Sequence, residues 1–68
     1  MNITILAVIL KTRRVEIGKS IYRIQLETGL HFETIRAIET GSGGYSINSM
    51  LSYLDAVGME IKLQKIDL

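Results

Sequence analysis

The sequence predicts a small, mainly α-helical domain with four short helices and one C-terminal β-strand. Three features lead to this prediction. Apolar residues recur at helical spacing as far as Gly58, and glycines separate the periodic segments from one another. After Gly58 the pattern changes to strict alternation of apolar and polar residues. A chain of 68 residues without a long linker has room for a single domain, residues 1–68.

The first helix is expected from about Thr4 to Glu16. Neighbouring side chains on a helix are about 100° apart, so this segment carries two apolar faces rather than one. Ile5, Val8 and Ile9 form a stripe nearly opposite the face that is expected to point inward. That inward face carries Ile3, Leu6, Leu10, Arg14 and Ile17.

Capping residues and glycines set the bounds of the next two helices. Ser20 offers an N-cap hydroxyl to a helix from Ile21 to Thr28, and Gly29 provides the left-handed residue that ends this helix. The third helix is expected from about Phe32 to Thr40, where Gly41 ends it.

The fourth helix is expected from about Ile47 to Val57. Ser46 is its expected N-cap, Gly58 ends it, and the glycine-rich loop 41–44 precedes it. Its inward face is expected to carry Met50, Leu51, Leu54 and Val57.

The alternation from Met59 to Gln64 predicts a half-buried β-strand over about residues 59–66. A strand in an otherwise helical chain has no partner, and its exposed edge is a site for association. We therefore expect the strand to pair with its own copy across a two-fold axis, which makes a homodimer. The competing interpretation is a strand over residues 2–9, a segment rich in β-branched side chains, which pairs with residues 59–66 within a monomer.

Composition argues against several classes of protein. Without cysteine there is no disulfide or thiolate metal site, and the single histidine, His31, cannot supply a His-rich metal site or a catalytic triad. We therefore expect neither an enzyme nor a bound cofactor or metal. The apolar segment Ile3–Leu10 is far shorter than the roughly 20 residues of a membrane span, and no Lys or Arg precedes it as in a signal peptide. A cytoplasmic protein without membrane contact is expected.

Residues 20–40 have the form of a helix-turn-helix unit, two short helices joined by a turn that contains Gly29. Leu30, Ile35 and Ile38 are expected to pack against Ile24. Five fragments stand in order from Leu10 to about Gly58: Arg14 ahead of Gly18, GKS at 18–20, ETGL at 27–30, TIRAIETG at 34–41 and SINSMLSYLDAVG at 46–58. In these fragments the chain resembles the lambda Cro and repressor-type (XRE-like) helix-turn-helix family.

The resemblance implies a DNA-binding transcriptional regulator, such as a phage-type repressor or an autoregulating antitoxin. In that family the third helix lies in the major groove and dimers read two half-sites. The base-reading positions are then Phe32, Glu33, Arg36 and Ala37. Phosphate contacts are expected from Lys19, Ser20, Arg23, His31, Ser42, Gly43 and Gly44. A solvated charge for Arg36, and a solvated or capping role for His31, are the competing interpretations.

Arg14 and Glu39 are charged residues on faces that otherwise point inward. The family commonly joins these two positions in a partly buried ion pair, so the resemblance implies a structural salt bridge.

Two classes of function follow from the sequence. The first is the DNA-binding regulator, whose partners are double-stranded DNA, a second copy of the chain and, for an antitoxin, a toxin or other protein. The alternative is a protein-interaction module of the same fold that does not bind DNA. A net charge of only +1 favours no partner by itself.

Overall fold

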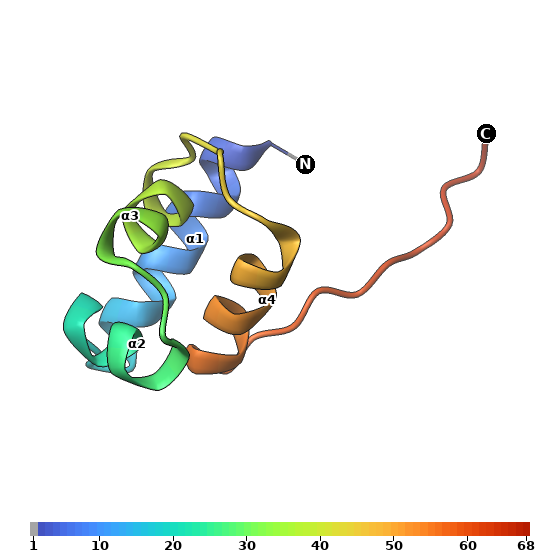
Figure 1. Cartoon of the computed structure of the whole chain (residues 1–68). Coiled ribbons are helices and arrows are strands. Elements are labelled where there is room, and N and C mark those ends of the chain that lie inside the picture. Colours follow the sequence, from blue (N-terminus) through green and yellow to red (C-terminus); the bar gives the residue numbers. More distant parts are fainter. Residues whose placement is uncertain (1) are drawn as a thin grey trace.

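The computed structural model describes residues 2–68, and four helices follow one another along this part of the chain (Figure 1). They are α1 (Ile3–Glu16), α2 (Ile21–Thr28), α3 (Phe32–Thr40) and α4 (Ile47–Ala56). The prediction of four helices is confirmed, and the bounds of α2 and α3 agree with it residue for residue. None of the helices within residues 2–68 has the length and apolarity that crossing a bilayer requires.

Side-chain caps explain where the helices begin. The Asn2 side chain accepts a hydrogen bond from the Thr4 N–H at 2.7 Å, which starts α1. Ser20 accepts from the Arg23 N–H at 3.0 Å, and Ser46 accepts from the Ser49 N–H at 3.1 Å. Because residues 3–9 belong to the capped first half of α1, the competing interpretation of a strand over residues 2–9 is wrong.

Two glycines end α2 and α3 in the left-handed conformation, with φ of 75° at Gly29 and 73° at Gly41. At Gly41 the surroundings also exclude a side chain. A Cβ atom there would lie 3.1 Å from the Thr4 Cα, which is backbone of α1 and cannot rotate away. Gly41 therefore lets the end of α3 approach the start of α1.

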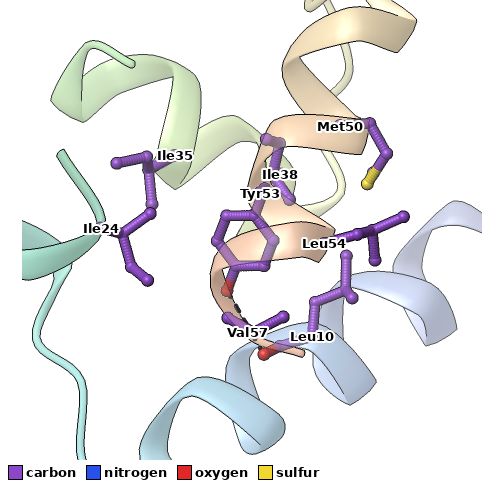
Figure 2. Packing of buried hydrophobic residues seen from close by; sticks show 8 residues of the cluster. All are labelled: Leu10, Ile24, Ile35, Ile38, Met50, Tyr53, Leu54 and Val57. Carbon is purple, nitrogen blue, oxygen red and sulfur yellow. Dashed lines mark hydrogen bonds between the residues drawn. The ribbon is translucent and has the colours of Figure 1, made fainter. Parts of the chain in front are cut away.

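One apolar core joins the four helices (Figure 2). The part of the core beneath the turn between α2 and α3 agrees with the prediction, because Ile24, Ile35 and Ile38 are all buried. The full cluster consists of Leu10, Ile24, Ile35, Ile38, Met50, Tyr53, Leu54 and Val57.

The predicted inward face of α4 is wrong in one residue. Leu51 is 46% exposed, whereas Tyr53 is completely buried. With Met50 and Leu54 on the buried face, Leu51 lies about 100° around the axis from Met50, too far to reach the core. Tyr53 lies closer to that face on the other side, and its hydroxyl finds hydrogen-bond partners inside the molecule.

The second apolar stripe of α1 points to solvent, as its position opposite the core face predicts. Ile5, Val8 and Ile9 are 60%, 61% and 48% exposed. On the inward face Leu10 and Arg14 are buried, while Ile3 at the helix start is exposed. The stripe is thus an apolar surface that no described part of the chain covers.

The C-terminal residues form an extended tail that leaves the helical body (Figure 1). The Met59 N–H donates to the Leu54 carbonyl at 2.9 Å, and beyond it Leu63 and Ile66 are 93% and 80% exposed. No β-strand occurs anywhere from residue 2 to residue 68, so the predicted strand over 59–66 is wrong for the single chain. The physical reason is that a strand needs a neighbouring strand, and residues 2–58 form only helices and the loops between them.

Candidate nucleic-acid interface

The inner sides of α2 and α3 are locked together by the core, which fixes the angle between them. Ile24 of α2 and Ile35 of α3 are fully buried, and Leu30 of the turn packs against the same cluster. The opposite side of α3 therefore faces outward.

The four predicted base-reading residues lie together on that outward side of α3. Phe32, Glu33 and Arg36 are exposed and Ala37 is half-buried. They line one shallow hollow of about 400 Å³ together with Thr40 and Ser42. Neither Glu33 nor Arg36 forms a salt bridge with any residue that the structure describes.

The Arg36 guanidinium lies over the ring of Phe32, with its Cζ atom 5.7 Å from the ring centroid. This is a cation–π distance, and the two side chains are one helical turn apart. The ring holds Arg36 on the outward face without neutralising its charge.

A buried hydrogen-bonded group behind α3 fixes the position of this helix. Arg14 donates from Nε to Glu39 Oε2 at 2.6 Å and from Nη2 to Glu39 Oε1 at 3.0 Å, a bidentate ion pair. The predicted contact between Arg14 and Glu39 is thus present, with side chains only 10% and 4% exposed. Arg14 Nη1 also donates to the Lys19 carbonyl at 2.9 Å.

Tyr53 is a member of this group that sequence reasoning missed. Its hydroxyl donates to Glu39 Oε2 at 2.5 Å. The hydroxyl also lies 3.3 Å from the Leu10 carbonyl, the contact drawn as a dashed line in Figure 2. Burial, and then the hydrogen bond with Glu39, raise the pKa of Tyr53 well above its usual value. The hydrogen bond to Glu39 likewise raises the pKa of Arg14. The hydroxyl therefore stays protonated and ties α4 to the ion pair between α1 and α3.

Two of the predicted phosphate contacts, Lys19 and Arg23, share one carboxylate. Lys19 Nζ lies 2.6 Å from Glu27 Oε1, and Arg23 Nε lies 2.6 Å from Glu27 Oε2. Hydrogen bonds from Arg23 and Lys19 lower the pKa of Glu27. Lys19 also donates to the Ala56 carbonyl at 2.7 Å, so it joins α2 to the end of α4. The i,i+4 spacing of Arg23 and Glu27 could have revealed part of this cluster.

The remaining predicted phosphate contacts flank α3 or start α2. The Ser20 hydroxyl caps α2, and the exposed His31 is the N-cap residue of α3 but makes no side-chain capping bond. Ser42 lines the hollow beside α3, with its hydroxyl 3.2 Å from that of Thr40. Gly43 and Gly44 follow in the left-handed conformation.

Lys11 of α1 is a further cation near the outward face of α3, and sequence reasoning did not assign it. It lines a second hollow, of about 190 Å³, between α1, the start of α2 and α3. Lys11 is exposed and forms no salt bridge within residues 2–68. Lys11 lies one helical turn before Arg14, and this spacing could have indicated its position on α1. The hollow is also lined by Arg14, Ile21, Phe32, Arg36, Glu39 and Thr40.

The described residues contain no group of three or more His, Asp or Glu side chains that could hold a metal ion. Comparison of the chain with known proteins found no family model that matches it. No curated protein matches it significantly either.

Proposed function

We propose that the protein is a sequence-specific transcriptional regulator of the XRE-like helix-turn-helix type, a phage-type repressor or autoregulating antitoxin, which binds double-stranded DNA in the cytoplasm. One observation carries the proposal. The outward face of α3 presents Arg36, which forms no salt bridge within residues 2–68, beside the exposed Phe32 and Glu33.

The dimensions of α3 support this proposal. A helix with its side chains is about 10–12 Å across, and the major groove of B-DNA is about 12 Å wide. The core and the Arg14–Glu39–Tyr53 group hold α3 from behind, so its outward residues would enter the groove on a rigid support. Arg36 would donate to guanine, and Glu33 would accept from cytosine N4.

Cations near α3 supply the attraction to phosphate that such binding needs. Lys11 and Arg36 form no salt bridge within the described chain, and Arg23 is 63% exposed although it contacts Glu27. Lys19 is the weakest candidate, because Glu27 and the Ala56 carbonyl already use its ammonium group.

A homodimer completes the proposal. The exposed tail alternates apolar and polar residues, and its main chain makes no hydrogen bonds beyond Met59 to any residue the structure describes. If two copies associate across a two-fold axis, the tail of one copy can pair with the tail of the other as a β-strand. Two copies of α3 would then face half-sites about 34 Å apart, one turn of the duplex.

A specific observation favours the alternative, a protein-interaction module that does not bind DNA. Ile5, Val8 and Ile9 make an apolar surface on α1 while the net charge of the chain is only +1. A toxin or other protein partner that covers this surface is the outcome to expect if the chain binds no DNA.

Arg36→Ala tests the proposed function. We expect it to weaken binding to the preferred duplex by about 1–3 kcal/mol, because a bidentate contact to guanine is lost. Leu51→Ala is the matched control, since it truncates another exposed side chain, on α4 and outside both the outward face of α3 and the tail. A mobility-shift titration with a duplex selected by the wild-type protein measures both effects. Unchanged affinity for Arg36→Ala would remove α3 as the reading helix.

A further inference from the structure

Phe32 is an unusual side chain for the centre of a polar interface. It is 45% exposed, it lies beside Arg36, and it lines both hollows that border α3. The ring cannot donate or accept a conventional hydrogen bond, so it gains nothing from a phosphate. If α3 enters the major groove, the ring must find an apolar contact there.

The position of the ring relative to Arg36 restricts what that contact is. A guanidinium that donates to both O6 and N7 of guanine lies close to the plane of that base. A group against the face of this guanidinium therefore lies toward the level of a neighbouring base pair, about 3.4 Å along the duplex. The Arg36 Cζ lies over the Phe32 ring, 5.7 Å from its centroid, which brings the ring within reach of the base pair next to that guanine.

Only one natural base offers an apolar group on its major-groove edge, which is the C5 methyl of thymine. Adenine and guanine present the N7 acceptor, and a ring over that atom would leave it without a hydrogen bond. A cytosine without a methyl group offers the ring much less apolar surface.

We propose that Phe32 and Arg36 act as one unit that reads a guanine next to a thymine-containing base pair, with the thymine methyl against the Phe32 ring. This inference rests on the proposed function and adds to it the class of DNA step that the protein selects. It also assigns Phe32 a role in specificity rather than in packing.

The test begins with selection of duplexes from a random library by the full-length wild-type protein. We expect each enriched half-site to contain a guanine adjacent to an A·T pair. The thymine of that pair is then replaced by deoxyuridine, which removes only the methyl group. Burial of one methyl group corresponds to about fourfold in affinity, so the wild-type protein should bind the uracil duplex about fourfold more weakly.

Phe32→Ala separates the role of the ring from other effects. It should bind the thymine and uracil duplexes equally, because the group that senses the methyl is gone. Leu51→Ala is the matched control, since Leu51 is 46% exposed on α4 and should leave the fourfold ratio intact.

The outcomes separate this inference from the proposed function. Equal binding of the thymine and uracil duplexes by the wild-type protein, or a fourfold ratio retained in Phe32→Ala, overturns the inference and leaves DNA recognition by α3 in place. A library that shows no enrichment at all overturns the proposed function together with the inference.

Discussion

At the scale of single residues, the most informative group is the Arg14–Glu39–Tyr53 cluster. Two charges and a hydroxyl are buried within an apolar core, yet no buried side-chain nitrogen or oxygen of the described chain lacks a hydrogen-bond partner. A buried ion pair stabilises a fold only when its remaining donors and acceptors are satisfied. Tyr53 and the Lys19 carbonyl satisfy them here. The cluster thereby sets the position of α3 relative to α1 and α4.

Glu39→Ala should destabilise the protein far more than Glu33→Ala. The first change leaves the Arg14 charge buried without its partner, at a cost of about 3–5 kcal/mol. The second removes an exposed carboxylate from the first turn of α3, which is worth under about 1 kcal/mol. Urea unfolding of both variants measures the difference, and Tyr53→Phe should fall between them. Similar midpoints for Glu39→Ala and Glu33→Ala would contradict the structural role of the ion pair.

The Arg14–Glu39 contact followed from a family resemblance, but Tyr53 could not be found in this way. The helical periodicity of α4 led to the prediction that Leu51 is inside, whereas the structure buries Tyr53 instead. Tyr53 is buried because its hydroxyl donates a hydrogen bond to the Glu39 carboxylate. This contact joins α4 to α3, and no local sequence pattern reveals it. The contacts of Lys19 with Glu27 and with the Ala56 carbonyl were not predicted for a similar reason, because they depend on the fold.

At the scale of elements, the helices were predictable because each has its own local signals. The Ser20 and Ser46 caps and the glycines at positions 29 and 41 act within one or two turns, and they mark the bounds of α2, the end of α3 and the start of α4 correctly. The C-terminal strand was not predictable in this sense. Its alternating pattern indicates a strand with one buried face, and no described residue of the single chain covers Leu63 or Ile66.

The junction of α2 with α4 should depend on pH through Glu27. Its pKa in the folded protein lies below the ordinary value of 4.5, so its salt bridges stabilise the fold fully above about pH 4.5. This stabilisation is lost as the pH falls below 4.5 through the folded-state pKa. We therefore expect Glu27→Gln to lower the melting temperature at pH 7 and to have a smaller effect at pH 3.

Glu16→Gln provides the control for this pH dependence. It removes an exposed carboxylate from α1 that forms no salt bridge within residues 2–68. Melting curves of both variants at the two pH values are compared with the wild type. A Glu27→Gln effect of the same size at pH 3 and pH 7 would show that the carboxylate charge does not hold α2 against α4.

At the scale of the whole molecule, the chain presents two apolar surfaces that no described residue covers, the α1 stripe and the exposed side chains of the tail. A domain of this size buries a comparatively small fraction of its surface on folding, so burial of both apolar surfaces in a dimer would add to its stability. We expect the full chain to be a dimer at tens of micromolar in sedimentation equilibrium.

A chain that ends at Glu60 should be monomeric, because it keeps the bond from Met59 to Leu54 but lacks the exposed apolar residues of the tail. A full-length chain that stays monomeric would contradict the dimer. A shortened chain that still dimerises would transfer the interface from the tail to the helical body.

The central claim is that the outward face of α3 contacts DNA. The most direct test is to add the duplex selected by the wild-type protein to the ¹⁵N-labelled protein and to measure the changes in the amide chemical shifts. We expect the largest changes at residues 31–37, at the start of α2 and at residues 42–44, with α4 around Leu51 little affected. No changes at all would contradict the claim and favour the protein-interaction module. Changes confined to the α1 stripe and the tail would contradict it by placing the DNA on a different surface.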